Sequence, residues 1–270
     1  MHTYTVVGST GFIGKNLLHF LKERGEKVLE VNRTISNENM SLGTVIYCAG
    51  FGGCDEPQKV IDANLNFLLE LLNTFSYERI FYISSSRLYL GSENGEEKAN
   101  LIISTDDRRS LFNLSKLTAE KLSIDNPRFV SLRVSNVYGD AFKSPLFLPT
   151  IIRDALRSKK IKMFTSKEYA KDYINVLDVC NAIYLLSKKN VLAHNLYNVA
   201  YSANVSANDI LNEISKNIDF SVDWVANSVD EVFPVINTER LRSEIDFKPS
   251  FVIDDISHIT KLFKANIDKL

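Results

Sequence analysis

The sequence predicts an α/β fold in which helices cover both faces of a doubly wound parallel sheet. Short apolar runs that suit buried strands alternate with helical patterns over the first half of the chain, and this alternation is typical of β-α-β units. A glycine-rich turn also separates the first of these strands from the first helix. Of the 270 residues, 45% are hydrophobic and 24% are charged, so we expect one globular unit with a sizeable core and a small C-terminal lobe.

The first unit of the pattern runs from residue 4 to residue 31. The apolar run Tyr4–Val7 predicts a strand, and leucines at helical spacing predict a helix over 15–24. Gly25 ends this helix, and 27–31 predicts the second strand. The glycines between the first strand and the helix therefore stand in the structural context that a dinucleotide-binding turn requires.

The later elements follow the same alternation as far as Gly139. They are three strands and two helices, expected at 44–48, 79–84 and 129–134 and at about 60–75 and 106–122. After Gly139 the pattern predicts short strands at 171–176 and 195–199 and helices at 146–156, 177–188 and 208–214. Only about a dozen residues separate the second strand from the strand at Thr44. A strand–helix crossover does not fit there, so the usual intervening strand and helix are expected to be missing or reduced.

The strongest local motif is Gly8-x-x-Gly11-x-x-Gly14. Gly8 permits the tight turn, Gly11 lets a diphosphate approach the backbone, and Gly14 lets the helix pack against the sheet. The N-terminus of the helix adds free N–H groups and a partial positive charge. The motif predicts a Rossmann-like site for a nicotinamide dinucleotide, formed by Gly8, Thr10, Gly11, Phe12, Ile13 and Gly14.

The end of the second strand bears on the choice between NAD(H) and NADP(H). An acidic residue there suits the ribose hydroxyls of NAD, whereas a neutral residue beside an arginine suits the 2′-phosphate of NADP. The strand ends at Val31 and is followed by Asn32 and Arg33, so NADP(H) is favoured. Two alternatives stay open: Arg33 is an ordinary surface arginine, or Glu30 is the acidic partner in a shifted register.

The chain is expected to divide into two units. A dinucleotide-binding domain takes 1–139 plus about 172–199, and a substrate-binding lobe takes about 140–171 plus 200–270. No low-complexity linker is visible, so the lobe is expected to be woven into the main domain and not tethered to it.

Composition excludes several other classes of protein. The formal net charge is −1 and no basic run stands out, so no nucleic-acid partner is expected. No apolar stretch is long enough to cross a bilayer, and Met1 leads into a strand-like run unlike a signal peptide, so no membrane partner is expected. Three cysteines without metal-like spacing favour a cytoplasmic protein, and four scattered histidines predict no metal site.

Further motifs extend over nearly the whole chain. Besides the glycine turn they are Ile83-Ser84-Ser85-Ser86-Arg87-Leu88-Tyr89, Leu132-Arg133-Val134-Ser135-Asn136-Val137-Tyr138-Gly139, Lys171-Asp172-Tyr173-Ile174-Asn175-Val176-Leu177-Asp178-Val179 and Asn195-Leu196-Tyr197-Asn198-Val199. Together they resemble the extended short-chain dehydrogenases/reductases of the nucleotide-sugar epimerase, dehydratase and reductase group. The resemblance implies a nucleotide-diphosphate sugar as substrate. It also implies a homodimer that pairs the helices near 60–75 and 112–122 of each copy.

The chemistry of that family uses a Ser or Thr with Tyr-x-x-x-Lys on a helix, which places Tyr and Lys one turn apart. The lysine lowers the tyrosine pKa and contacts the nicotinamide ribose, and the tyrosine exchanges a proton with the substrate. By resemblance Ser85 is the serine, with Ser86 as the alternative, and Lys116 is the lysine.

The position of the catalytic tyrosine holds Phe112. Phenylalanine keeps the ring but has no ionisable oxygen, so it neither gives nor takes a proton. Two explanations are open: the chain is an engineered tyrosine-to-phenylalanine variant made to trap a substrate, or the protein naturally lacks this acid and uses another donor or is inactive. The first is preferred because the flanking residues keep the family pattern.

The resemblance also assigns residues on either side of the reacting groups. Asn136 is expected to meet the substrate diphosphate together with Lys171, which replaces an arginine and loses its bidentate geometry. Ser85 and Ser86 face the substrate, and the cofactor is lined by Ser84, Cys48, Ala49 and Gly50. Asn64 either orients the strand-end loops or is satisfied within its helix. Arg240 or Arg242 either reaches phosphate or is surface charge on a helix.

The residues after Ser85 bear on the reaction. Dehydratases of this group usually follow the catalytic Ser or Thr with an acidic pair, and here Ser86-Arg87 stands in its place, which argues against 4,6-dehydration. We therefore expect NADPH-dependent reduction of a 4-keto nucleotide-diphosphate sugar. The alternatives are an NAD-dependent nucleotide-sugar 4-epimerase and a non-catalytic dinucleotide-binding protein, the last supported only by Phe112.

Overall fold

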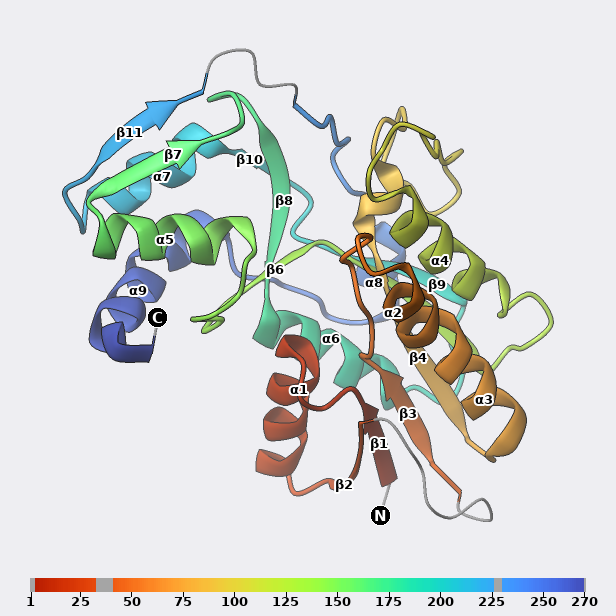
Figure 1. Cartoon of the computed structure of the whole chain (residues 1–270). Helices are drawn as coiled ribbons and strands as arrows, with labels where there is room; N and C mark the ends of the chain where they lie inside the picture. The colour runs from red at the N-terminus through yellow and green to blue at the C-terminus, as the bar shows by residue number, and fades with distance from the viewer. Residues whose placement is uncertain (1–2, 33–40, 226–229, 270) are drawn as a thin grey trace.

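A six-stranded parallel sheet lies at the centre of the computed structural model, which describes residues 3–32, 41–225 and 230–269 (Figure 1). Every strand of this sheet pairs in parallel with its neighbours. The spatial order is β2-β1-β3-β4-β5-β9, with β1 at Thr3–Val7, β2 at Lys27–Val31, β3 at Thr44–Tyr47, β4 at Arg79–Ser85, β5 at Phe129–Val134 and β9 at Leu196–Val199. The predicted parallel α/β architecture is confirmed.

Helices cover both faces of this sheet, as a doubly wound fold requires. One face carries α1 (Phe12–Glu23) and α6 (Val176–Ser187), which lie against each other. The other face carries α4 (Ser110–Lys121) and one continuous helical stretch. That stretch consists of α2 (Pro57–Ile61), the π-helical turn η1 (Asp62–Asn66) and α3 (Phe67–Thr74).

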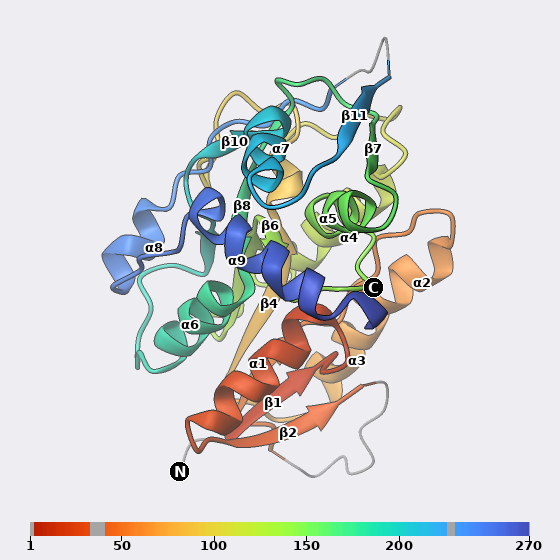
Figure 2. The same ribbon diagram turned by 90° about the vertical axis from the view of Figure 1, so that its left-hand side faces the viewer.

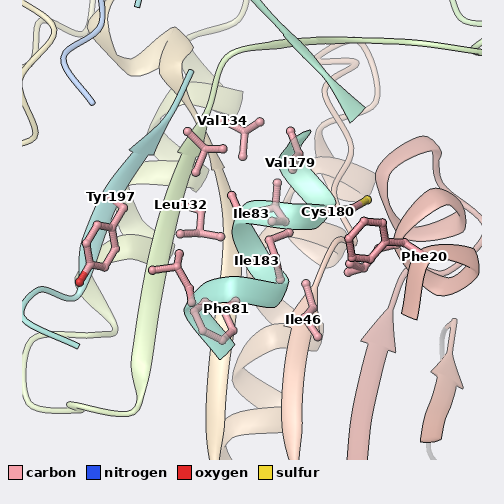
Figure 3. Packing of buried hydrophobic residues seen from close by; sticks show 14 of the residues in the cluster. Phe20, Ile46, Phe81, Ile83, Leu132, Val134, Val179, Cys180, Ile183 and Tyr197 are labelled. Atoms are coloured by element: carbon pink, nitrogen blue, oxygen red, sulfur yellow. The ribbon is translucent and has the colours of Figure 1, made fainter. Parts of the chain in front are cut away.

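The apolar core lies on both faces of the sheet because successive residues of a strand point to opposite sides. Phe81 and Ile83 of β4 point toward Ile183 and its neighbours on α6, as Figure 3 shows. Ile80 and Tyr82 of the same strand join the cluster under α3 and α4. Burial on both faces explains why these strands read as continuous apolar runs in the sequence.

The C-terminal lobe has an apolar cluster of its own and lies beyond the large sheet in Figure 2. Its elements are α5 (Phe147–Arg157), β7 (Lys160–Met163), α7 (Ala207–Ser215), β11 (Ser221–Trp224) and α9 (Val252–Ala265). A three-stranded sheet of β6 (Asn136–Tyr138), β8 (Ala170–Asn175) and β10 (Asn204–Ser206) completes it, and β7 pairs with β11. The short helix α8 (Glu239–Glu244) instead buries Leu241 in the core beside α6.

The structure differs from the sequence-based expectation at two helices. The helical stretch expected at 60–75 begins earlier, at Pro57, because proline suits the first turn of a helix. The pattern predicts no element where α9 lies, although its apolar face packs into the lobe. Within the described ranges no strand pairs with the outer edge of β2, and no helix is long and apolar enough to cross a membrane.

A buried ion pair joins α4 to the sheet. Arg133 of β5 donates to both carboxylate oxygens of Glu120 at 2.9 and 2.7 Å, and their side chains are 4% and 5% exposed. Ser84 of β4 donates to the same carboxylate at 2.6 Å. Tyr89 accepts a bond from Arg133 and donates to Asn198 of β9. This network fixes α4 against three strands of the sheet.

Removing one partner of this pair should destabilise the fold strongly. In Arg133→Met the Glu120 carboxylate stays buried without its cation, so we expect unfolding in urea to lose about 3–5 kcal/mol. Lys216→Met breaks the exposed pair of Lys216 with Glu213 and should cost less than about 1 kcal/mol. Equal losses in the two variants would contradict this account of the core.

Candidate active site

A cleft of about 420 Å³ lies at the carboxyl ends of the central strands, where ligands bind in open α/β sheets. The start of α1, the loop after β3, the end of β4, α4 and the end of β5 form its wall, and Lys171 and Phe233 close it from the lobe. The predicted site residues on this wall are Gly11, Phe12, Ile13, Cys48, Gly50, Ser84, Ser85, Ser86, Phe112, Lys116, Asn136 and Lys171. We call this hollow the strand-end cleft.

The glycine turn, residues 8–14, brings the start of α1 to the cleft. Gly8 has a φ of +80°, and a Cβ there would lie 2.7 Å from the Ala49 amide nitrogen. A Cβ on Gly14 would lie 2.2 Å from the Gly8 carbonyl oxygen, so the helix packs tightly on the turn. No side chain caps this end of α1. Its first amides can therefore bind an anion, and the turn fits the diphosphate of a dinucleotide.

Several predicted cofactor residues support the turn from outside the cleft wall. Thr10 is exposed, Ala49 lies behind the Gly8 turn, and Asn32 accepts a hydrogen bond from Ser9 at 3.0 Å. Glu30, the alternative acidic partner, pairs with Lys22 at 2.8 Å. The strand end thus presents a neutral amide, and Arg33 lies outside the described residues.

The three predicted reacting positions come together in the strand-end cleft. Ser85 ends β4, and its hydroxyl accepts the Arg87 amide at 3.1 Å, which starts the 3₁₀ helix η2 (Ser86–Tyr89). Lys116 donates to the Ile83 carbonyl at 2.8 Å. Its ammonium lies 5.8 Å from the centre of the Phe112 ring, one turn earlier on α4. The spacing seen in the sequence therefore yields one joint site.

Burial dominates the electrostatics of Lys116, whose side chain is on the cleft wall but is buried. Burial lowers the Lys116 pKa to about 8, and the negative charge of Glu120 opposes this shift. Burial raises the pKa of the Cys48 thiol, so Cys48 is neutral at ordinary pH. Lys116 is therefore a cation near pH 7 that loses its proton on mild alkalinisation.

Asn64 joins the loop after β3 to α4. The side chain is buried in the π-helical turn η1, donates to Ser115 at 2.8 Å and donates to the Phe51 carbonyl at 3.1 Å. It also accepts the Phe51 amide at 3.1 Å. Asn64 thus holds a strand-end loop in place, the first of the two expected roles. A Cβ on Gly50 would lie 3.1 Å from both Asn64 Oδ1 and Lys116 Nζ, so this loop passes close to the lysine.

The substrate side of the cleft differs from expectation at Lys171. Lys171 does not stand as a free cation, because its ammonium pairs with Glu231 at 3.1 Å. Glu231 also pairs with Arg87 at 2.5 Å. Burial opposes ionisation of Glu231, but Arg87 and Lys171 lower its pKa to about 2. Glu231 therefore already pairs with Lys171, the residue that was expected to bind the substrate phosphate.

Asn136, Arg240 and Arg242 are the other residues that were considered as contacts of the substrate phosphate, and only the first of them lines the cleft. Asn136 is on the cleft wall and donates to the Asp172 carbonyl at 2.8 Å. Neither Arg240 nor Arg242 lines the strand-end cleft. Arg240 lies 3.5 Å from Glu97, and Arg242 donates to Thr238 at 3.0 Å. Arg242 is exposed, as the interpretation of a helix-surface charge expects, whereas Arg240 is partly buried and pairs with the buried Glu97.

Sequence reasoning missed Arg109, Phe233 and Glu231, and gave Arg87 no binding role. All of these except Glu231 line the cleft, and Glu231 binds two residues that do. Arg109 precedes Phe112 by three residues, so helical spacing from the predicted catalytic position was a usable signal. Glu231 and Phe233 lie in a stretch without periodicity, which carries no such signal.

The family is shown by comparison with known proteins. The family described as "NAD dependent epimerase/dehydratase family" matches residues 4–200, and the chain belongs to it. CDP-abequose synthase of Salmonella typhimurium is 25% identical over 237 residues, covering 75% of this chain and 76% of that protein. UDP-glucuronate 4-epimerase of Thermodesulfobacterium geofontis is 23% identical over 252 residues, covering 76% of each. The family match supports a nicotinamide-dinucleotide cofactor, and the names of both relatives refer to nucleotide sugars.

Solved structures share the fold over nearly the whole chain. MoeE5 in complex with UDP-glucuronic acid and NAD has a TM-score of 0.84 at 18% identity and covers 97% of this chain and 99% of its own. RMD from Pseudomonas aeruginosa complexed with NADPH has a TM-score of 0.78 at 19% identity and covers 98% and 99%. At these identities the likeness concerns the fold, and the two neighbours carry different nicotinamide cofactors.

Substitution of the glycines should separate folding from cofactor binding. In Gly14→Ala the new methyl group meets backbone oxygen, so we expect a loss of about 2 kcal/mol or more in urea unfolding. In Gly11→Ala the new Cβ lies 3.4 Å from the Gly8 oxygen, an ordinary contact. That variant should keep its stability within about 1 kcal/mol but lose at least about tenfold in NADPH affinity by calorimetry. Equal stability of the two variants would contradict the tight packing of α1 on the glycine turn at Gly14.

The lowered pKa of Lys116 should appear in the pH dependence of stability. The folded chain loses this proton near pH 8 and the unfolded chain near pH 10.4. Between these values the unfolded chain binds one proton more, so stability rises with pH. Relative to Lys116→Met, wild-type unfolding free energy should gain up to about 3 kcal/mol from pH 8 to pH 10.5. Parallel curves for the two proteins would show that the lysine is not desolvated.

Proposed function

We propose that the chain carries the framework of an NADPH-dependent reductase acting on a 4-keto nucleotide-diphosphate sugar. The observation that carries the proposal is the convergence of Ser85, Lys116 and the Phe112 ring on one cleft beside the glycine turn. A tyrosine at position 112 would complete the proton-transfer set of the family. This set needs the hydroxyl, the lysine and the serine in one place, and the backbone provides that arrangement.

The carboxylates near Ser85 do not suit an elimination reaction. Asp107 and Glu231 both pair with Arg87, at 3.0 and 2.5 Å. With its pKa lowered to about 2, Glu231 remains ionised and is a poor acid near neutral pH. Reduction or epimerisation therefore suits the site better than dehydration.

The proposed roles follow from position. The start of α1 holds the diphosphate of the cofactor, and Lys116 donates to the ribose next to the nicotinamide. The bound nicotinamide supplies or accepts a hydride. Ser85 donates a hydrogen bond to the carbonyl oxygen of the sugar, while Asn136 binds the substrate diphosphate. Phe112 keeps the wall of the pocket but supplies no proton, which fits a variant that binds substrate and turns over slowly.

NADP(H) is proposed over NAD(H) because no free carboxylate stands at the β2 end among the residues that the structure describes there. Asn32 is neutral and Glu30 is paired with Lys22, so neither offers an acceptor pair to ribose hydroxyls. Arg33 adds the cation that a 2′-phosphate prefers. Three free cysteines suit a reducing, cytoplasmic compartment.

An NAD-dependent 4-epimerase is the second candidate, favoured by the epimerase among the relatives and by the NAD in MoeE5. Such an enzyme keeps its cofactor through the cycle, so NAD that co-purifies with the protein would favour it. For either enzyme we propose a homodimer through α3 and α4, where Leu69 and Leu114 are exposed by 39% and 47%. We also propose the two-unit division, with the substrate held by the lobe.

Restoring the hydroxyl tests the proposed chemistry. In Phe112→Tyr the new phenol stands beside Lys116, so NADPH oxidation with 4-keto nucleotide sugars should rise by about a hundredfold or more over wild type. The double variant Phe112→Tyr with Lys116→Met should lose most of this gain, because the lysine no longer lowers the phenol pKa. Turnover unchanged by the tyrosine would rule out this mechanism.

A further inference from the structure

Cations outnumber carboxylates around the strand-end cleft. The basic residues on its wall are Arg87, Arg109, Lys116 and Lys171. Among the described residues, Asp107 pairs with Arg87, and Glu231 pairs with both Arg87 and Lys171. Lys116 is accounted for by its place beside the cofactor. Arg109 is therefore a basic residue on the cleft wall that has no role in the proposed reaction.

The guanidinium of Arg109 is exposed on the cleft wall and stacks on the Phe112 ring. Its centre lies 4.7 Å above the Phe112 ring, and no side-chain hydrogen bond or ion pair of Arg109 occurs among the described residues. Asp107 accepts its backbone amide at 2.9 Å and fixes the turn. A Cβ on Gly52 would lie 3.1 Å from the guanidinium, so the absence of a side chain there makes room for it. Burial and the neighbouring charge of Arg87 lower the Arg109 pKa.

Arg87 leaves a second donor unused in the same cleft. It follows Ser85 by two residues and is 8% exposed, and its amide is bonded to the Ser85 hydroxyl. One terminal nitrogen serves Asp107 and Glu231. The Nε atom is buried and has no hydrogen-bond partner among the described residues. An unpaired buried donor on a guanidinium is costly, so Arg87 stands on the cleft wall with its hydrogen bonding incomplete.

The position of these donors distinguishes them from a phosphate site. Asn136 stands where the substrate diphosphate is proposed to bind, and Lys171 is paired with Glu231. Arg87 and Arg109 instead adjoin Ser85 and Phe112, so they border the sugar carbon that reacts. Two guanidinium groups at that end match a planar carboxylate, which accepts paired N–H bonds. A neutral hexose gives neither of them a charged partner.

We propose that Arg87 and Arg109 form a subsite for a carboxylate carried by the sugar of the substrate. This inference rests on the proposed nucleotide-sugar function and names the substrate class of that site. It concerns binding and holds for reduction and for epimerisation alike. Arg109 supplies the exposed guanidinium, and Arg87 adds positive charge on the cleft wall and places the subsite next to Ser85.

Calorimetry with a matched pair of ligands tests the proposal. The nucleotide is first chosen as the tightest binder among UDP, CDP, dTDP and GDP. Wild-type protein is then titrated with the glucuronic acid and glucose esters of that nucleotide, which differ only in a carboxylate replacing a hydroxymethyl group. We expect the uronate to bind at least about tenfold more tightly. Arg109→Gln should reduce this preference to about twofold or less, and Arg109→Lys should keep part of it.

The control is Arg108→Gln, because Arg108 is exposed and does not line the cleft. It should keep the wild-type preference. Affinity for the free nucleoside diphosphate should be the same in all four proteins, which separates the subsite from the nucleotide site. Equal wild-type affinity for uronate and hexose, or a preference that survives Arg109→Gln, would overturn the carboxylate subsite alone. Failure of every nucleotide to bind would overturn the proposed function and this inference with it.

Discussion

The geometry of the cleft depends on the buried pair between Glu120 and Arg133. Phe112, Lys116 and Glu120 follow each other at four-residue intervals, so they share one face of α4. Glu120 fastens that face to β5 and, through Ser84, to β4. Lys116 is then held at the Ile83 carbonyl one turn away. A helix placed by a bidentate ion pair inside the protein has little freedom to slide, and positioning groups of this kind contributes much of the rate of enzymes.

Charge in the cleft is shared between the two parts of the chain. Arg87 follows the end of β4, whereas Lys171 and Glu231 belong to segments that reach the cleft from the lobe. The Glu231 carboxylate therefore links the sheet to the lobe across the cleft. Because each cation neutralises part of the same carboxylate, an arriving anion competes with Glu231 for both. If the proposed substrate diphosphate binds here, its affinity depends on Glu231, which is 60 positions away from Lys171 in the sequence.

Members of one fold family perform different reactions because the scaffold fixes the cofactor while a few side chains decide the chemistry. Here the glycine turn, Ser85 and Lys116 keep the common arrangement. Arg87 stands two residues after Ser85, where an acidic pair would favour dehydration, and Phe112 removes the proton donor. In the proposed function these two positions distinguish this chain from a dehydratase and from a fully active reductase.

The sequence by itself determined the sheet, the glycine turn and the spacing of Ser85, Phe112 and Lys116, because these features depend on neighbours within a few residues or on regular burial. It also indicated the short connection between β2 and β3, since chain length alone limits what fits there. In the lobe α9 was missed, although Val252, Ile256, Ile259 and Phe263 stand at helical spacing in the sequence. Tertiary structure alone decided that Lys171 meets Glu231 and that Arg240 pairs with Glu97. Lys171 and Glu231 are 60 positions apart, and Glu97 and Arg240 are farther apart still. Electrostatic contacts at that range leave no periodic pattern in a single sequence.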